Sequence, residues 1–186
     1  TFSTLFPNAM QPAHGIFVEN RLRHLVASGQ VSSRVVAPVP WFPFSSSLFG
    51  RYAIGAKIAP TEQRFGLQVI HPKYGVLPKA GMTLAPAAIY AACLPFLRKL
   101  QKERDFDLID AHYFYPDGVA AVWLGRKLGK PVVITARGTD INLIPKYLLP
   151  RRMILSAASH AAAIITVSRA LKDEIVALGV PDEKIT

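Results

Sequence analysis

The sequence predicts an α/β fold: a Rossmann-like, doubly wound, mainly parallel sheet with helices on both faces. Short β-branched runs recur along the chain, and segments with helical spacing separate them. The clearest runs show no alternation of polar and apolar residues, which is typical of parallel strands buried on both faces. Strands that alternate with helices form βαβ units, and 186 residues suffice for one such domain.

The first elements give weaker signals than the later ones. Residues 1–5 are typical of the end of a strand, and the prolines, asparagine and glycine of residues 6–15 predict a loop. Apolar residues at i, i+4, i+7 and i+8 from Val18 predict a helix that ends near Gly29. A short strand is then expected at residues 34–37.

The middle of the chain combines a proline-rich segment with a long apolar one. Three prolines in residues 38–47 predict a loop that carries exposed aromatic side chains. A short strand is expected at 67–70 and a long helix at 83–102, whose basic end suits the helix dipole. The apolar run at 84–97 is shorter than the roughly 20 residues that span a bilayer, which favours a helix buried against the sheet.

The second half predicts alternating strands and helices most clearly. Its strands are expected at residues 108–111, 132–136 and 163–167. Its helices are expected at residues 118–128, 149–160 and 170–178. Ser168 is a typical N-cap and Gly179 a typical residue after the last helical turn. Residues 181–186 indicate a turn that enters a further strand, so we expect a piece of a longer, two-domain protein.

The composition excludes several classes of protein. Apolar residues make up 51% and charged residues 18%, so the chain can bury a core and is not disordered. Its single cysteine excludes a disulfide framework, and no pair of cysteines or histidines has metal-ligand spacing. Lys and Arg number 22 against 12 Asp and Glu, a net charge of +10 that predicts a polyanionic partner.

Polar residues follow the predicted strands, where ligands bind in open α/β sheets. His14 and Gly15 precede the first helix, whose amides favour an anion, although a simple turn is an equal alternative. His112 follows the fourth strand and can donate a hydrogen bond to a sugar hydroxyl or stabilise charge in a transition state. The alternative is a packed histidine, with Asp117 capping the next helix.

The fifth strand is followed by an arginine and an aspartate. Arg137 can bind a phosphate or carboxylate through two hydrogen bonds, and Asp140 can accept from hydroxyls or orient Arg137. A purely structural Arg–Asp pair is the alternative. Ser168 follows the sixth strand and is expected mainly to cap a helix. The dinucleotide fingerprint, the P-loop and the nucleophile elbow are absent from the sequence.

In this order, the strand-end motifs resemble the N-terminal half of retaining glycosyltransferases of family 4. The motifs are Phe6-Pro7-Asn8 with Pro12-Ala13-His14-Gly15, His112 with Pro116-Asp117-Gly118, Arg137-Gly138-Thr139-Asp140, and Val167-Ser168-Arg169. The resemblance implies a GT-B fold, in which two Rossmann-like domains face each other across a cleft. It implies that residues 1–186 form one N-terminal, acceptor-side domain and that the C-terminal nucleotide-sugar-binding domain is absent from this chain.

The resemblance also implies an activity. A hexosyl group passes from a nucleotide-sugar to a glycan or lipid-linked acceptor with retention, without a metal or other cofactor, and the fragment alone is expected to be inactive. We expect catalytic roles for His112, Arg137 and Asp140. We expect substrate contacts from His14, Gly15, Tyr113, Asp117, Gly138, Thr139 and Ser168. Arg137 replaces the commoner histidine of the family, and a guanidinium binds phosphate or an acidic sugar but cannot act as a general base.

The basic charge has a candidate use at an anionic membrane. Enzymes of this kind act in polysaccharide biosynthesis, so the resemblance implies a cytoplasmic protein that is peripheral on the inner membrane face. The side chains expected at the lipid are Arg98, Lys99, Lys102, Lys146, Arg151 and Arg152, with Trp41, Phe42 and Phe44 at the interface. A solvated basic surface is the alternative.

Two other functions stay open at this point. A nucleotide-sugar epimerase with the GT-B fold shares the architecture, and a non-catalytic module that binds a nucleotide or a glycan would suit the charge and the crevice. Binding of nucleic acid is not expected, because the aromatic residues are not interleaved with basic ones.

Overall fold

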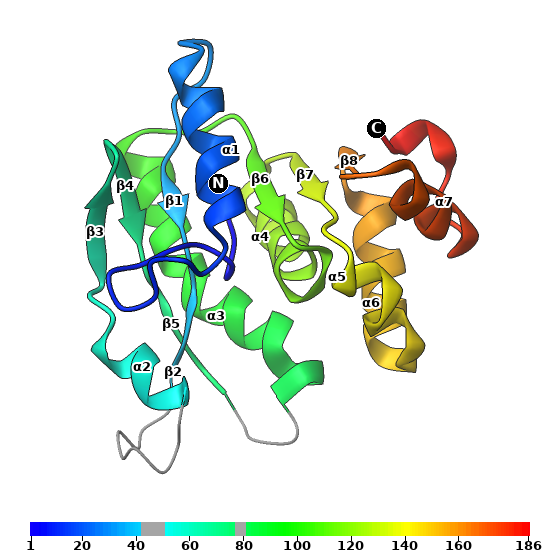
Figure 1. Cartoon of the computed structure of the whole chain (residues 1–186), viewed down its shortest axis with the longest axis horizontal. Coiled ribbons are helices and arrows are strands. Elements are labelled where there is room, and N and C mark those ends of the chain that lie inside the picture. The colour runs from blue at the N-terminus through cyan, green and yellow to red at the C-terminus, as the bar shows by residue number, and fades with distance from the viewer. Residues whose placement is uncertain (42–50, 77–80) are drawn as a thin grey trace.

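The computed structural model describes residues 1–41, 51–76 and 81–186. The helices are α1 (Ile16–Ala27), α2 (Arg51–Lys57), α3 (Gly81–Glu103), α4 (Val119–Leu128), α5 (Thr139–Asn142), α6 (Leu148–His160) and α7 (Arg169–Ala177). The strands are β1 (Val35–Val36), β2 (Val39–Trp41), β3 (Thr61–Arg64), β4 (Leu67–Ile70), β5 (Lys73–Gly75), β6 (Ile109–His112), β7 (Val132–Thr135) and β8 (Ala163–Ile165). Figure 1 shows their arrangement.

The N-terminal residues join two sets of strands into one sheet. The order is β3-β4-β1 on one side and β6-β7-β8 on the other, and Phe2 forms parallel bridges to both Val36 and Ala111. All of these pairings are parallel except that of β3 with β4. At the far edge Ile185 forms a single isolated parallel bridge to Ile164; the further strand expected from residues 181–186 stays a prediction.

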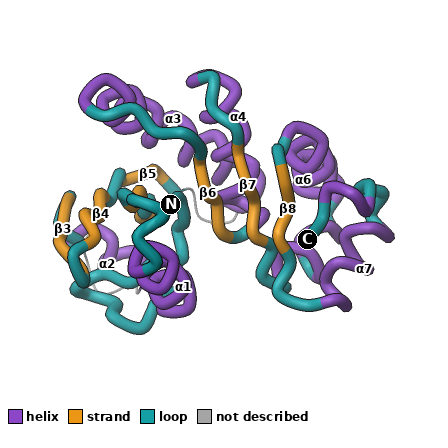
Figure 2. The backbone as a smooth tube through the Cα atoms, turned by 90° about the horizontal axis from the view of Figure 1, so that it is seen from above, coloured by secondary structure: helices purple, strands orange, loops and turns teal. Residues whose placement is uncertain are grey.

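Helices cover both faces of this sheet. Figure 2 shows α3, α4 and α6 on one side of β6, β7 and β8, with α1 and α7 on the other. The main apolar core lies between the strands and these helices and includes Ile134, Leu124 and Ile154. A smaller core packs α1 against β1 and β4 through Val18 and Leu22. The continuous β-branched runs are therefore buried on both faces, as the sequence predicts.

The prediction of a loop across residues 38–47 is wrong for its first part, while residues 42–47 lie outside the described chain. β2 contains Pro40 and pairs in parallel with β5. Proline lacks an N–H, but this short ladder uses the amide of Val39, which donates to the Pro72 carbonyl at 2.9 Å, and the carbonyl of Trp41, which accepts from Val76 at 3.2 Å. The hydrogen bonds between β2 and β5 therefore do not need an N–H group at residue 40, as is usual for a proline in an edge strand.

Helix α3 is longer than the apolar run from which it was predicted. It is 23 residues long, and by length and composition alone it could cross a membrane. In this fold one of its faces is buried through Ile89, Cys93 and Leu97, and the three side chains belong to the main core. The prediction of a helix packed on the sheet is confirmed for that face.

Asp117 fastens the N-terminal segment to the turn that follows β6. Its Oδ2 accepts from the Thr4 amide at 2.7 Å, the Thr4 hydroxyl at 3.0 Å and the Ser3 hydroxyl at 3.3 Å. The carboxylate is fully buried, and the N-terminus of α4 has no side-chain cap, so the expected capping role is wrong. Burial raises the pKa of Asp117 to about 7, against the lowering effect of these hydrogen bonds.

We expect Gly15→Ala to destabilise the fold by about 2 kcal/mol more than Gly29→Ala. Both glycines have a left-handed backbone, with φ of 68° and 73°, and alanine there costs about 1 to 2 kcal/mol. Only at Gly15 does a Cβ meet a neighbour, at 2.3 Å from the Leu5 carbonyl oxygen, so the loop must shift. Urea denaturation measures both losses, and equal losses would mean that the loop yields freely.

We expect Asp117 to make the free energy of unfolding fall as pH rises from 4 to 8. Its pKa is higher in the folded protein than the 3.8 of a free carboxyl. As pH rises, the carboxyl therefore ionises in the unfolded chain at a lower pH than in the folded protein, and this ionisation stabilises the unfolded state relative to the folded one. The loss is on the order of 3 kcal/mol. Asp117→Asn cannot ionise and should flatten this part of the profile; parallel stability curves for the two proteins would contradict the prediction.

Candidate functional site

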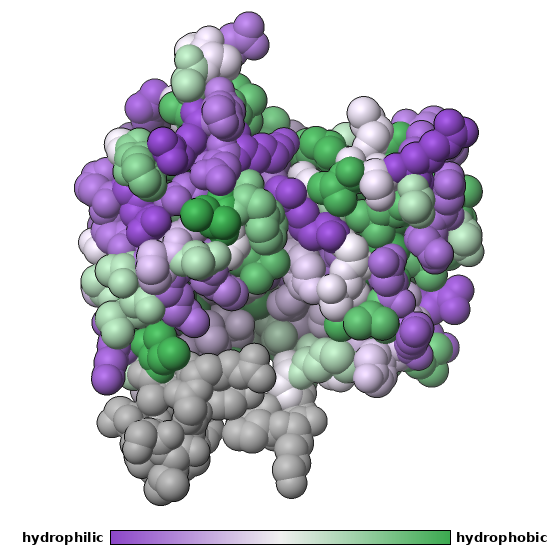
Figure 3. All heavy atoms as spheres, in the orientation of Figure 1, coloured by the Kyte–Doolittle hydropathy of each residue, from purple (hydrophilic) through white to green (hydrophobic). Residues whose placement is uncertain are grey.

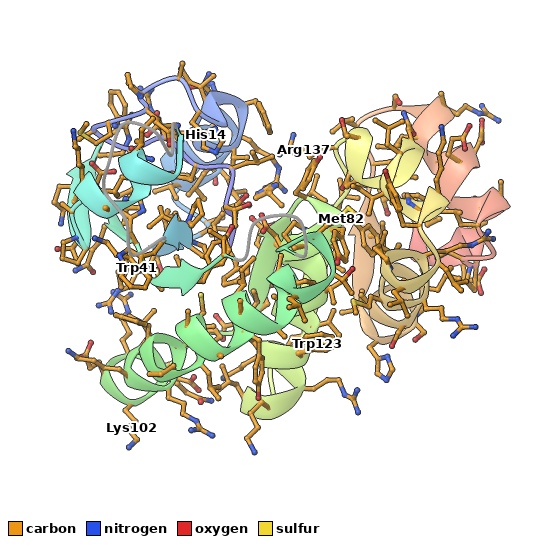
Figure 4. All side chains as sticks on the ribbon, turned by 90° about the horizontal axis from the view of Figure 1, so that it is seen from below. His14, Trp41, Met82, Lys102, Trp123 and Arg137 are labelled. Carbon is orange, nitrogen blue, oxygen red and sulfur yellow. The ribbon has the colours of Figure 1, made fainter. Side chains whose placement is uncertain are left out.

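The polar residues predicted at the strand ends come from loops at one edge of the sheet. β6 and β7 are parallel, with His112 opposite Thr135, so the residues that follow them emerge side by side. Figure 4 views the molecule from below, and Arg137 lies there between the α1 side and the α5 side of the molecule. This is the carboxyl edge, where ligands bind in doubly wound sheets.

Asp140 connects the two loops. Its carboxylate accepts from the amides of Phe114, Arg137 and Gly138, at 2.5, 3.1 and 2.7 Å for the closest contacts. The side chain is fully buried, and burial raises its pKa while these amides oppose the shift. Asp140 was expected to be catalytic, but in this structure its oxygens are occupied by backbone donors, and it does not pair with the Arg137 guanidinium. Its role is therefore to hold the loops.

His112 and Arg137 are brought into direct contact. The Nη2 of Arg137 lies 2.9 Å from Nδ1 of His112, and Nε2 of the same ring lies 3.1 Å from Oδ2 of Asp110. The ring has no exposed side-chain surface, which corrects the expectation that His112 faces the crevice. Both ring nitrogens are engaged inside the protein, so His112 positions Arg137 and does not present itself to a ligand.

These contacts determine which nitrogen of His112 carries the proton. A guanidinium only donates, so Nδ1 accepts from Arg137, and Nε2 carries the hydrogen that Asp110 accepts. Arg21 Nη1 also lies 3.2 Å from Nε2, but in this arrangement it donates to Asp110 instead. Arg21 lies 3.2 Å from the same Asp110 oxygen and forms an ion pair with it. Burial lowers the pKa of His112, although Asp110 opposes the shift. The ring is therefore neutral near pH 7.

Arg137 is the cation that this arrangement leaves at the edge of the sheet. Its side chain is partly exposed, and its guanidinium carbon lies 4.9 Å from the centre of the Phe17 ring. Phe17 itself is 44% exposed and belongs to the first turn of α1. A cation over an aromatic ring is attracted to it, so α1 and His112 together hold this group in place.

Gly15 and His14 form the start of α1 beside this group. Gly15 is buried, and a Cβ there would meet the Leu5 carbonyl oxygen, so glycine is needed for the start of α1 to pack against the preceding loop. His14 is exposed, and its Nε2 lies 3.2 Å from the Thr4 carbonyl. Both residues therefore lie where the sequence places them, next to the strand end.

The remaining expected substrate residues have different surroundings. Tyr113 adopts a positive φ of 80°. The half-buried hydroxyl of Tyr113 forms a hydrogen bond with the side chain of Thr139. Gly138, with φ of 131°, begins α5. Ser168 accepts from the Leu171 amide at 3.3 Å as the N-cap of α7, which confirms the capping alternative. Asp117 is enclosed, which corrects the expectation that it contacts a substrate, whereas Ser168 is exposed and its expected substrate contact stays a prediction.

Sequence reasoning missed Asp110, Arg21 and the use of Phe17. Asp110 precedes His112 by two residues in β6 and so shares its side of the strand, a signal that could have been used. Arg21 and Phe17 are four residues apart on α1 and face the same way, but nothing local indicates that this face meets β6. Among the described residues no group of three or more potential metal ligands occurs.

A hollow of about 540 Å³ lies away from this site, at the amino end of β6. The end of α1, the segment before β1 and the end of α3 line it, through residues such as Leu25, Arg34 and Leu100. Arg21 and Asp110 border it as well. None of the strand-end loops that carry His14, Arg137 or Thr139 reaches it, so we place the candidate site at the carboxyl edge.

Comparison with known proteins agrees with this architecture. A crystal structure from Listeria monocytogenes, provisionally assigned as a UDP-N-acetylglucosamine 2-epimerase, superposes with a TM-score of 0.57 at 12% identity. The match covers 99% of this chain and 43% of that one. At this identity the likeness concerns the fold alone, and it confirms the Rossmann-like α/β class of a GT-B half.

Sequence comparison identifies relatives that are longer than this chain. TuaC of Bacillus subtilis, provisionally assigned as a teichuronic acid biosynthesis glycosyltransferase, is 27% identical over 176 residues, which cover 92% of this chain and 44% of TuaC. An uncharacterized glycosyltransferase of Methanocaldococcus jannaschii, MJ1178, is 27% identical over 78 residues, 42% of this chain and 22% of that protein. The chain thus spans less than half the length of these relatives.

The family model described as Glycosyltransferase Family 4 matches residues 58–186, which include β6, β7 and the loops that carry His112 and Arg137. The chain belongs to glycosyltransferase family 4.

Proposed function

We propose that this chain is the acceptor-side domain of an enzyme that transfers a hexosyl group from a nucleotide-sugar to a glycan or lipid-linked acceptor, with retention. The observation that supports it best is the contact between His112 and Arg137 at the carboxyl edge of the sheet. A C-terminal domain binds the nucleotide-sugar across the cleft, so the chain by itself is inactive. The reaction needs no metal or other cofactor.

The residues of this chain serve transfer by holding charge in place. Arg137 presents N–H donors to the oxygen atoms of a bound sugar or phosphate and is held in place by Phe17 and His112. Preorganised donors of this kind stabilise charge that develops in a transition state at little cost of reorganisation.

Two alternatives make different use of the same edge. An epimerase would convert the nucleotide-sugar without any acceptor, and a binding module would retain a nucleotide or glycan without turnover. The weak structural likeness to the Listeria protein suits either GT-B activity, whereas membership of family 4 favours transfer. Transfer of sugar to an added acceptor supports the proposal; epimerised nucleotide-sugar alone, or binding without chemistry, would replace it.

An anionic membrane is the partner that we propose for the α5–α6 corner. Tyr147, Leu148 and Leu149 are 56%, 64% and 51% exposed, and basic side chains flank them: Lys146, Arg151 and Arg152, all exposed. Figure 3 shows hydrophobic atoms beside hydrophilic ones over this region. Exposed leucines next to cations suit the interface of anionic lipid. A peripheral, cytoplasmic enzyme at the inner membrane face follows from this proposal.

The other side chains expected at the membrane do not form one continuous patch of apolar and basic residues. Trp41 is 40% exposed at the end of β2, while Phe42 and Phe44 lie outside the described residues. Arg98, Lys99 and Lys102 are exposed on the last turns of α3, and Lys99 forms an ion pair with Glu103 at 3.7 Å. The α5–α6 corner therefore supports the proposal better than the end of α3 does.

In the full-length protein, we expect His112→Gln to lower kcat/KM for sugar transfer by about 10- to 100-fold. The variant loses a buried hydrogen bond to a charged group, an interaction of about 1.5 to 3 kcal/mol. Wild-type activity should also fall at acid pH, where a protonated Nδ1 no longer accepts from Arg137, and the variant should lack this limb. His24→Gln, on the exposed side of α1, is the matched control. Unchanged turnover in His112→Gln would contradict the positioning role.

We expect the double variant Leu148→Asp, Leu149→Asp to bind anionic vesicles at least tenfold more weakly than the wild type. Each leucine contributes roughly 1.5 kcal/mol or more on burial, and an added carboxylate repels the lipid. Sedimentation with vesicles of phosphatidylglycerol and phosphatidylcholine measures binding, which should weaken with salt. Val176→Asp, exposed on α7, is the control. If the wild type does not bind in a salt-sensitive way, the membrane proposal fails.

A further inference from the structure

We propose that His71 and Glu62 form a buried imidazolium–carboxylate pair that positions the loop of residues 8–14 at the carboxyl edge of the sheet. The charged pair stands without the proposed function, and only the use of the loop in sugar transfer rests on it. Three features of the molecule support this assignment: the hydrogen-bond partners of the His71 ring, the charges around Glu62, and the contact of Glu62 with the loop.

His71 directly follows β4, at the same edge of the sheet as His112 and Arg137. β4 pairs in parallel with β1, and Phe2 bridges β1 and β6 in parallel, so the carboxyl ends of these strands lie at one edge. The side chain of His71 has no exposed surface. It therefore contacts groups of the protein alone, which makes it a positioning residue and not a catalytic one.

Both nitrogens of the His71 ring face oxygen atoms that accept hydrogen bonds. Nδ1 lies 3.0 Å from the carbonyl oxygen of Ala37, and Nε2 lies 2.9 Å from Oε1 of Glu62. A neutral imidazole has a single N–H, so one of these contacts would place two lone pairs against each other if Glu62 is ionised. A ring that carries hydrogen on both nitrogens donates to both oxygens, and the contacts are therefore those of an imidazolium.

The surroundings of Glu62 keep the shared proton on the ring. A protonated Glu62 could donate to a neutral His71, but its second oxygen, Oε2, accepts from the amide of Ala9 at 3.1 Å. The charges of Glu62 and Arg64 also attract each other. A hydrogen-bond donor and a nearby cation both favour the ionised carboxylate. Glu62 therefore accepts from His71, and both members of the pair are charged.

With His71 positive, the charges of the side chains around Glu62 balance. Arg64 binds Glu19 of α1, with Nε 2.6 Å from Oε1. This hydrogen bond, together with the charges of Glu19 and Glu62, raises the pKa of Arg64 against the effect of burial. Two carboxylates and two cations thus meet, and none of these four side chains is more than 16% exposed. A neutral ring would leave one of the carboxylates without a partner in an enclosed place, which is costly.

Glu62 connects the charged pair to the loop that precedes α1. The residue whose amide it binds, Ala9, lies in a turn that Asn8 closes, because Oδ1 of Asn8 accepts from the amide of Gln11 at 2.9 Å. The carbonyl of Gln11 accepts in turn from the amide of His14 at 3.1 Å. Hydrogen bonds therefore run from the enclosed imidazolium to His14, which is exposed beside the strand ends.

The pair fixes the loop through the direction of one carboxylate. Because His71 holds Oε1 of Glu62, Oε2 stays turned toward the amide of Ala9. A free glutamate on an edge strand would lose side-chain freedom on making this contact, and the ion pair has already removed that freedom. Loss of either partner should therefore loosen residues 8–14 without removing a group that contacts a ligand.

Nitrogen-15 spectra of the histidine rings in the full-length protein test the charge of His71, whose signals are assigned with His71→Asn. At pH 7.5 a free histidine is mostly neutral, so hydrogen on both ring nitrogens identifies the pair. In Glu62→Gln the amide can donate to Nε2 while its oxygen still accepts from Ala9, so the ring should become neutral with its hydrogen on Nδ1. Glu183→Gln, at an exposed carboxylate, is the matched control. A neutral His71 in the wild type overturns the pair.

Hydrogen exchange of the full-length protein tests the positioning of the loop. The amides of residues 9–14 should exchange about tenfold faster in Glu62→Ala, which loses the hydrogen bond to Ala9. His71→Asn, which frees the carboxylate, should act in the same direction, and Glu62→Gln should keep most of the protection. Unchanged exchange in α7, at the other end of the sheet (Figure 1), shows that each variant is folded. Loop exchange at the wild-type rate in folded Glu62→Ala overturns the positioning role.

A kinetic assay separates this inference from the proposed function. The donor probes are UDP-glucose, UDP-N-acetylglucosamine and GDP-mannose, and release of UDP or GDP is measured. With a donor that the wild type consumes, Glu62→Ala should raise KM about tenfold and change kcat little, because a loosened loop weakens binding and removes no reacting group. An unchanged KM overturns the use of the loop in substrate binding. If the wild type consumes none of the donors, the proposed function loses its support, while the spectra and the exchange rates still decide the inference.

Discussion

The hydrogen bonds from backbone amides to Asp140 are the constraint on which the site depends. They hold the loop after β6 and the loop after β7 at a fixed separation, and this separation places Arg137 within hydrogen-bond distance of His112. They also direct both carboxylate oxygens to the backbone, so Asp140 acts on Arg137 as a nearby negative charge and not through a direct ion pair. One acidic side chain therefore sets both the geometry and the charge of the edge, because its oxygens are directed to the backbone.

The buried charges of the site form a chain in which each group determines the state of the next. Arg21 and Asp110 neutralise each other, Asp110 fixes the Nε2 proton of His112, and the free Nδ1 can then accept from Arg137. Charged groups are buried at acceptable cost only when they are paired or hydrogen-bonded. The chain ends on a cation at the surface, so the ligand side of the site receives a positive charge while the interior stays balanced.

The sequence predicted the second half of the fold well and the first half poorly, for a physical reason. β6, β7 and β8 are buried on both faces, so their residues are continuously apolar and recognisable. β3 alternates between exposed and partly exposed residues, and β2 contains a proline, so neither shows a typical strand pattern. The expectation that ligands bind at strand ends located His112, Arg137 and Asp140 but did not predict their roles. Those roles depend on contacts such as that of Arg21 with Asp110, which are 89 positions apart in the sequence, and no local pattern encodes such a contact.

The identity of residue 137 decides how this edge responds to pH. The family that the sequence resembles commonly has a histidine at this position, which loses its charge near neutral pH. An arginine stays protonated at any physiological pH and reaches further from the backbone, so it can contact His112 and Phe17 at once. Burial is the main cause of the lowered pKa of His112, and the charges of Arg137 and Arg21 lower it further against the opposing effect of Asp110. In this chain the titratable group is therefore the buried one, and the group at the surface is permanently charged.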